Sequence, residues 1–191
     1  MLKVVQDKIN TCGRIIGDDI LKVDSFVNHQ IDVSLMRQIG KYYASEFENV
    51  DKILTIETSG IAIAMAAAMA MNDIPVLFAK KAKSKIVDEN VYKTDVYSFT
   101  KGNFSTVSVS KDYLKKGERI LIVDDFLADG NASFGLIDLC KQAGAEVLGV
   151  CVVIDKAFQA GRKKLTEANI KLVSCASVAE FKDGKVVFAN Y

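Results

Sequence analysis

Apolar positions along the chain alternate between helical spacing and strand-like runs. Residues 2–12 and 35–47 carry apolar stripes at helical spacing, and Asp32 or Ser34 is suited to cap the second helix. The run KILTIE at 52–57 predicts a buried strand. The alanine-rich segment IAIAMAAAMAM that follows is too short to span a bilayer and predicts a buried helix.

The rest of the chain continues this alternation. Two segments in which apolar and polar residues alternate, TDVYSF and STVSVS, predict an antiparallel pair of strands. Continuous apolar runs at 119–123 (RILIV) and 147–154 (VLGVCVVI) are typical of strands covered on both faces. A helix is predicted over 132–143, where Gly144 is a stop signal, and a shorter one near 162–167. The remaining strand-like runs are PVLFAK, IKLVSC and GKVVFA.

Strands that alternate with helices predict an α/β fold, in which an open, mostly parallel, twisted sheet carries helices on both faces. Ligands of such sheets bind beyond the carboxyl ends of the strands. Candidate chemistry is therefore expected just after 52–57, 75–80, 119–123 and 147–154.

Length, composition and charge limit the number of domains and the kinds of partner that we expect. The 191 residues fit a single domain, and half of them are apolar, which is enough for a substantial core. Lys and Arg number 25 against 24 Asp and Glu, so the overall charge favours neither nucleic acid nor a membrane surface as a partner. The four cysteines match neither a disulfide framework nor a zinc pattern, and His29 is the only histidine. This cysteine usage favours a reducing, cytoplasmic setting, and the start MLKVVQDKIN turns polar too soon for a signal peptide.

An acidic pair ends the predicted strand 119–123. Asp124 and Asp125 are followed by Gly130 in a tight turn and by a helix that starts near Ala132. Backbone N–H groups of the turn and of the first helical turn, together with the helix dipole, make an anion site, and glycine lets the backbone approach a phosphate closely. Two carboxylates beside such a site suit the hydroxyls of a ribose or a magnesium ion.

Three other phosphate-handling motifs do not match this loop. A Walker loop is absent because no GxxxxGK[ST] occurs, and a dinucleotide fingerprint is absent because the loop lacks GxG. Receiver domains that accept a phosphoryl group carry an acidic pair after a strand but lack the glycine turn. An ordinary strand–turn–helix junction with a solvated acidic pair remains open from the local pattern alone.

The segment VDDFLADGNAS resembles the phosphoribosyl pyrophosphate (PRPP) motif of type I phosphoribosyltransferases. The resemblance implies the fold of that family, Mg²⁺ carried with PRPP, and Asp124 and Asp125 on the ribose hydroxyls. It also implies a loop that wraps the 5′-phosphate, formed by Ala128, Asp129, Gly130, Asn131 and Ala132. Many members carry Thr or Ser hydroxyls in this loop, so phosphate binding here is expected to depend on backbone N–H groups, Asn131 and Ser133. The Asp129 carboxylate should point away from the phosphate, or act as a general base or helix cap.

Two further segments fall at the expected edge of the sheet. Thr58, Ser59 and Gly60 open the alanine-rich helix, and in the family this turn binds the pyrophosphate of PRPP. A serine at a helix start is ordinarily a cap. Lys80, Lys81, Lys83 and Lys85 follow the next strand. They fit an ordinary solvated loop, whereas the family implies a flap over PRPP in which Lys81 contacts the pyrophosphate.

Four segments together resemble the bacterial members of the family that act on xanthine: 21–32, 96–101, VDDFLADG and VIDKAFQAG. This resemblance implies that Leu21, Asn28 and Lys156 contact the purine, with Lys156 at the 6-oxo group and Asn28 near the 2-position. It also implies a small hood built from residues 1–32 and the C-terminal strands, and a homodimer. A PRPP- or purine-sensing regulator on the same fold, and an enzyme for guanine or hypoxanthine, remain alternatives.

Overall fold

Eight strands of the described residues form one sheet in the order β10-β9-β8-β7-β3-β4-β6-β5. The computed structural model describes residues 1–17, 20–81, 90–98 and 103–189. The strands are β3 Lys52–Ile56, β4 Val76–Lys81, β5 Val91–Ser98, β6 Asn103–Ser110, β7 Arg119–Leu127, β8 Glu146–Lys156, β9 Leu172–Lys182 and β10 Lys185–Phe188. Neighbours from β9 through β4 are parallel, whereas β10 and the β5–β6 pair add antiparallel edges.

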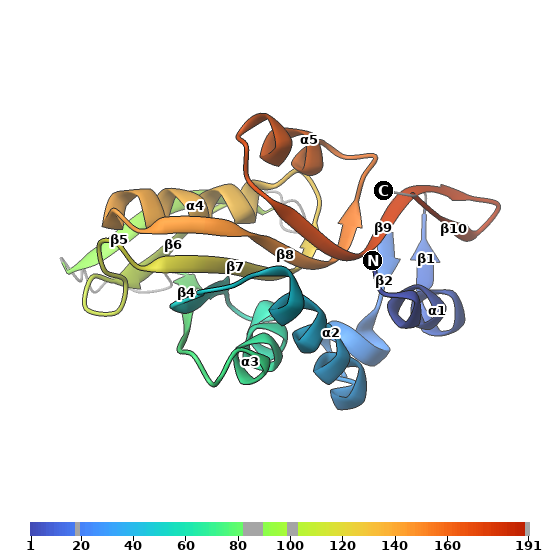
Figure 1. Ribbon diagram of the computed structural model, residues 1–191. Helices are drawn as coiled ribbons and strands as arrows, with labels where there is room; N and C mark the ends of the chain where they lie inside the picture. The colour runs from blue at the N-terminus through green and yellow to red at the C-terminus, as the bar shows by residue number, and fades with distance from the viewer. Residues whose placement is uncertain (18–19, 82–89, 99–102, 190–191) are drawn as a thin grey trace.

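Helices cover both faces of this sheet (Figure 1). On one face lie α4 Asn131–Ala143 and α5 Ala160–Glu167, and on the other lie α2 Val33–Glu46 and α3 Gly60–Ala70. This arrangement confirms the predicted α/β fold with a mostly parallel sheet. It also places the acidic pair and the loop before α4 at the carboxyl ends of the central strands, where such folds bind ligands.

The core explains why the central strands are continuously apolar. Ile53 of β3 packs into the cluster beneath α2 and α3, and the next residue, Leu54, packs into the cluster beneath α4. Ile122 and Val123 of β7 divide between the same two clusters. Successive strand side chains point to opposite faces, so a strand buried on both sides needs apolar residues at every position.

The N-terminal segment lies against the C-terminal strands at one end of the sheet (Figure 1). It comprises α1 Lys3–Cys12, the hairpin of β1 Arg14–Ile16 and β2 Ile20–Lys22, and a π-helical turn Asp24–Asn28. The Leu2 N–H donates to the Cys175 carbonyl of β9 at 2.8 Å. The two chain ends, which are the segments predicted to form the hood, thus lie together.

Strand β7 runs further than the sequence predicts. Strand β7 does not end at Asp124 and Asp125 but continues to Leu127, which pairs with Asp155 of β8. Parallel pairing with β8 extends the strand past the apolar run that predicted it. The predicted flap lysines Lys83 and Lys85 lie outside the described residues, as do residues 99–101 of the segment that began at Val96. Within the part of the chain that the structure describes, no helix is long and apolar enough to cross a membrane.

Candidate active site

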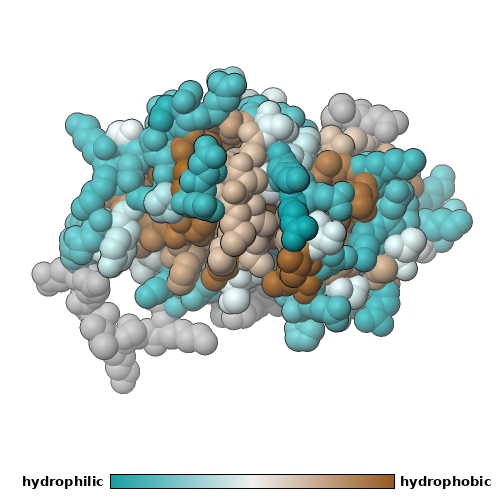
Figure 2. Space-filling view, turned by 60° about the horizontal axis from the view of Figure 1, so that its bottom comes forward, coloured by the Kyte–Doolittle hydropathy of each residue, from teal (hydrophilic) through white to brown (hydrophobic). Residues whose placement is uncertain are grey.

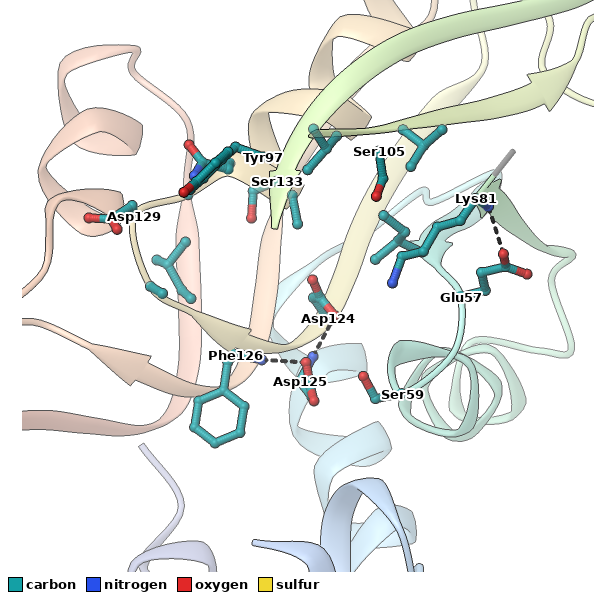
Figure 3. Close-up of a pocket in the computed structure, with 18 residues that line it drawn as sticks. Glu57, Ser59, Lys81, Tyr97, Ser105, Asp124, Asp125, Phe126, Asp129 and Ser133 are labelled. Atoms are coloured by element: carbon teal, nitrogen blue, oxygen red, sulfur yellow. Dashed lines mark hydrogen bonds between the residues drawn. The ribbon is translucent and has the colours of Figure 1, made fainter. Parts of the chain in front are cut away.

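A cavity opens at the carboxyl ends of β3, β4 and β7 (Figure 3). The turn after β3, the loop before α4 and the β5–β6 hairpin complete its walls. Ten of the predicted site residues line it: Ser59, Lys81, Asp124, Asp125, Ala128, Asp129, Gly130, Asn131, Ala132 and Ser133. Segments far apart in the sequence are thus brought together as predicted for an open parallel sheet.

The two acids of β7 differ in environment. Asp124 is buried and Asp125 is half-buried, and their carboxyl groups project from opposite sides of the strand (Figure 3). Asp124 accepts a 2.9 Å hydrogen bond from the N–H of Asp125, and Asp125 accepts one of 2.9 Å from the N–H of Phe126. Each carboxylate is therefore oriented by the backbone of the next residue.

Burial dominates the electrostatics of Asp124. Desolvation raises the pKa of its carboxyl well above the ordinary 3.8, and the adjacent charge of Asp125 raises it further. The backbone N–H of Asp125 and the Lys81 ammonium act in the opposite direction. A cationic or hydroxyl-bearing ligand at this carboxylate would remove part of the cost of holding its charge inside the protein.

Helix α3 starts in close contact with the acidic strand. A Cβ on Gly60 would lie 2.1 Å from Oγ1 of Thr55 and 3.3 Å from Oδ1 of Asp124, so only glycine lets the helix start so near both strands. Ser59 is the N-cap residue but makes no capping hydrogen bond with its side chain. Ser59 therefore lacks the hydrogen bond expected of an ordinary capping serine.

The loop after β7 has the backbone form expected of an anion site. Gly130 adopts φ +84°, a left-handed conformation that glycine tolerates best, and is the N-cap residue of α4. The first-turn N–H groups of Asn131, Ala132 and Ser133 have no partner within their own helix. Together with the helix dipole, they favour a bound anion at this end of α4.

The side chains of Ser133 and Asp129 occupy different positions at the start of α4. Ser133 is buried and lines the cavity, so it is the hydroxyl available beside the backbone N–H groups. The Asp129 carboxylate points away from Asp124 and Asp125 (Figure 3), and no side-chain cap bonds α4. Asp129 therefore does not cap α4 with its side chain.

The turn after β3 is tied to the end of β4. The Glu57 N–H donates to the Ala79 carbonyl at 3.1 Å, and the Lys81 N–H donates to Oε1 of Glu57 at 2.6 Å. The Lys81 side chain extends into the cavity from the end of β4 (Figure 3). An ammonium and the start of α3 thus face the same space.

The residues predicted to bind a base do not line this cavity. Asn28 is exposed and lies with Thr58 and Ser59 in an adjoining hollow, which Ser59 shares with the main cavity. Leu21 is buried in the core and lines a separate hollow between α1 and the C-terminal hairpin. The Lys156 ammonium, at the end of β8, lies 5.9 Å from the centre of the Phe126 ring.

Several cavity residues carried no predicted role, and the polar or aromatic ones among them are Glu57, Tyr97, Ser105 and Phe126. Tyr97 and Ser105 come from the β5–β6 hairpin, where Tyr97 packs edge-on against Phe104 at 5.2 Å. The alternation of TDVYSF shows which residues share a face but not which face meets the cavity. Phe158, in the segment VIDKAFQAG, is exposed and packs edge-on against Phe181.

Comparison with known proteins agrees with this geometry. Residues 24–183 match the phosphoribosyl transferase domain family. The chain belongs to the phosphoribosyltransferase family, and the prediction of a transferase is confirmed. It is 52% identical over 189 residues to the xanthine phosphoribosyltransferase of Clostridioides difficile, an alignment that covers 98% of this chain and 100% of that protein. It is 49% identical over 190 residues to the Lactococcus lactis subsp. cremoris protein of the same name, covering 98% and 96%.

Solved structures show the same fold at low sequence identity. The adenine phosphoribosyltransferase of Giardia lamblia, solved with 9-deazaadenine, has a TM-score of 0.74 at 18% identity and covers 93% of this chain and 98% of its own. The Rhodothermus marinus enzyme of the same name has a TM-score of 0.71 at 21% identity, covering 92% and 99%. These matches confirm the type I phosphoribosyltransferase fold.

Proposed function

We propose that this chain transfers the 5-phosphoribosyl group of PRPP to a ring nitrogen of xanthine, giving xanthosine 5′-monophosphate and pyrophosphate in purine salvage. The observation that carries this proposal is the acidic pair Asp124 and Asp125, which lies in one cavity with the loop that opens α4. The full-length xanthine phosphoribosyltransferase relatives support the choice of base.

The cavity divides into parts that suit the parts of PRPP. The N–H groups at the start of α4, with Asn131 and Ser133, would hold the 5′-phosphate. Asp124 and Asp125 would accept hydrogen bonds from the ribose hydroxyls. Thr58, Ser59 and Gly60, with Lys81, would hold the pyrophosphate, which leaves as the bond from C1 of the ribose to oxygen breaks.

The chemistry needs charge stabilisation rather than a strong nucleophile. Transfer at a sugar carbon passes through a ribose with oxocarbenium character, as in glycoside hydrolysis. The carboxylates near the ribose stabilise its positive charge, and the Lys81 ammonium stabilises the negative charge of the departing pyrophosphate. Fixed positions of both substrates supply the rest of the rate enhancement.

Magnesium fits this donor set through its preference for oxygen. Asp124 and Asp125 offer carboxylate oxygens, the ligands that Mg²⁺ favours. Among the described residues, no group of three or more Asp, Glu, His or Cys side chains could hold a metal ion. Most ligands would therefore come from PRPP and water. When bound, Mg²⁺ would neutralise charge on the pyrophosphate.

The base would lie outside the main cavity, which has a volume of about 240 Å³. This is less than the roughly 300–1,000 Å³ of ordinary ligand pockets, so PRPP and a purine together would need the adjoining hollow as well. Asn28, in the adjoining hollow, would donate to the oxygen at position 2, and the Lys156 ammonium would donate to the 6-oxo group. Leu21, whose side chain is buried in the core, would reach the base only through its backbone.

We also propose a homodimer in the cytoplasm. Met65 and Met69 on α3 and Val33 at the start of α2 are exposed, and Figure 2 shows an apolar band across this face. A second copy would cover these side chains. All four cysteines are free, which suits a reducing compartment. Size-exclusion chromatography with light scattering tests the dimer, and a mass of one chain contradicts it.

Turnover with four bases tests the reaction. Purified protein is given PRPP, Mg²⁺ and either xanthine, guanine, hypoxanthine or adenine, and pyrophosphate release is measured. We expect release to require both PRPP and a base, with the highest kcat/KM for xanthine. A higher kcat/KM for another base would overturn the base assignment, and no release with any base would favour a sensing protein on this fold.

A further inference from the structure

Helix α5 touches the outer side of the loop that precedes α4. The Gly161 N–H donates to the Ala128 carbonyl at 2.9 Å. The Lys164 ammonium donates to the Asp129 carbonyl at 3.0 Å. Two successive carbonyl groups of the loop are therefore held on the side that faces α5.

Because the peptide bond is planar, this contact with α5 also fixes the direction of the loop N–H groups on the cavity side. In a trans peptide, the carbonyl of one residue and the N–H of the next point in opposite directions. With the Ala128 and Asp129 carbonyls directed to α5, the N–H groups of Asp129 and Gly130 are directed away from it. Since both residues line the cavity, these two donors face the proposed phosphate position.

The ammonium also strengthens one of these donors. A charged donor on a carbonyl polarises the peptide unit, and hydrogen bonds in series reinforce one another in a medium of low dielectric. The Asp129 carbonyl and the Gly130 N–H belong to one peptide unit. Lys164 therefore makes the Gly130 N–H a better donor to an anion without touching that anion.

Helix α5 is itself anchored to the buried sheet. Arg162 donates from Nε to Oδ2 of Asp155 at 2.6 Å, and the Ser177 hydroxyl donates to the same oxygen at 2.7 Å. Asp155 is fully buried, and so is Leu165 on the next turn of the helix. A helix fixed in this way can hold the loop in one position.

We infer that α5 positions the phosphate loop and that Lys164 is a positioning residue for the 5′-phosphate of PRPP. This inference rests on the proposed function, because it assumes that the loop binds that phosphate. Lys164 is exposed, so its replacement should leave the fold intact. The same helix supplies a matched control, since the neighbouring Lys163 has an 80% exposed side chain and pairs only weakly with Glu167, at 3.8 Å.

The test compares Lys164→Met, Lys164→Arg and the control Lys163→Met. Loss of one hydrogen bond should raise the KM for PRPP and the Kd for ribose 5-phosphate about three- to tenfold in Lys164→Met. We expect the KM for xanthine and the Kd for pyrophosphate, a ligand without the 5′-phosphate, to change less than about twofold. Lys164→Arg, which retains a cationic donor, should restore most of the loss.

Three results would overturn the inference. The first is equal weakening of ribose 5-phosphate and pyrophosphate, which would show a general effect of charge. The second is an effect of Lys163→Met as large as that of Lys164→Met. The third is normal binding and turnover by Lys164→Met. Each of these contradicts only the positioning role, whereas absence of PRPP turnover by the unaltered protein with any base contradicts the proposed function.

Discussion

The side-chain amide of Asn28 donates a 3.1 Å hydrogen bond to Oδ2 of Asp125, 97 positions further along the chain. The other carboxylate oxygen of Asp125 accepts from the Phe126 N–H. The orientation of a proposed ribose-binding acid is thus shared between its own strand and a residue of the proposed base site. This bond couples the two halves of the site.

Replacing Asn28 should distinguish its proposed contact with the base from its hydrogen bond to Asp125. In Asn28→Ala, we expect kcat/KM for xanthine to fall about tenfold, the size of one lost hydrogen bond. Hypoxanthine lacks the oxygen at position 2, so its kcat/KM should fall less and the preference for xanthine should narrow. Steady-state kinetics with both bases measures this ratio. Equal losses for the two bases would show that Asn28 acts only by orienting Asp125.

Lys156 should affect the purine more than PRPP. The ammonium is proposed to donate to the 6-oxo group, a contact that Lys156→Met removes while it keeps most of the apolar stem over Phe126. We expect the KM for xanthine to rise about tenfold and the KM for PRPP to stay within about twofold. The matched measurement varies each substrate at saturating levels of the other. Equal increases in both KM values would contradict a base-specific role.

Asp124→Asn should trade activity for stability. Burial raises the pKa of this carboxyl in the folded protein, so between the unfolded pKa of about 3.8 and the higher folded pKa the folded state binds more protons than the unfolded state. Stability that Asp124 permits at low pH is therefore lost as pH rises through that window. An amide has no charge to bury and keeps an oxygen for the Asp125 N–H, so this loss disappears.

Thermal denaturation without ligands tests whether Asp124→Asn stabilises the folded protein. We expect the Tm of Asp124→Asn at pH 7 to exceed that of the unaltered chain by about 2–4 °C, which corresponds to ~1 kcal/mol in a chain of this size. The difference should shrink as pH is lowered toward 4. Asp125→Asn, at a half-buried position, is the control and should shift Tm less. A difference that grows at low pH would contradict the assignment. Turnover by Asp124→Asn should fall about 10- to 100-fold.

The strand–loop–helix unit around Asp124 was predictable because its boundaries carry local signals. Gly130 and Gly144 mark turns through their left-handed backbone, and the apolar run before Asp124 marks the strand. The end of β7 was not predictable, since its last pairs are set by β8 across the sheet. Tyr97 and Ser105 were missed for the same reason: the pairing of β6 with β4, a contact distant in sequence, decides which hairpin face meets the cavity.

The residues proposed to bind the base could not be predicted from the local sequence pattern. Asn28 and Lys156 lie on separate elements without a common spacing, and Asn28 approaches Asp125 only through the packing of the N-terminal segment. No periodicity in residues 21–32 marks this contact. Only the resemblance to a known family singled out these positions, and the kinetic tests above decide their roles.

Gly130 provides a test that separates backbone strain from ligand binding. Both Gly130, at φ +84°, and Gly117, at φ +80°, hold a left-handed conformation that costs a residue with a Cβ about 1–2 kcal/mol. A Cβ on Gly117 meets nothing within 4 Å, whereas one on Gly130 lies 3.3 Å from Cα of Gly161 and from the Phe134 ring. Gly117→Ala is therefore the matched control for strain alone.

We expect both alanine variants to lower Tm, with the larger fall in Gly130→Ala because its neighbours must also shift. Only Gly130→Ala should weaken ribose 5-phosphate, by about tenfold or more, since the loop N–H groups would leave the positions that face the anion. Calorimetric titration of each variant below its Tm gives the Kd. If Gly130→Ala binds ribose 5-phosphate as tightly as Gly117→Ala does, the phosphate lies elsewhere in the cavity and the loop before α4 has only a structural role.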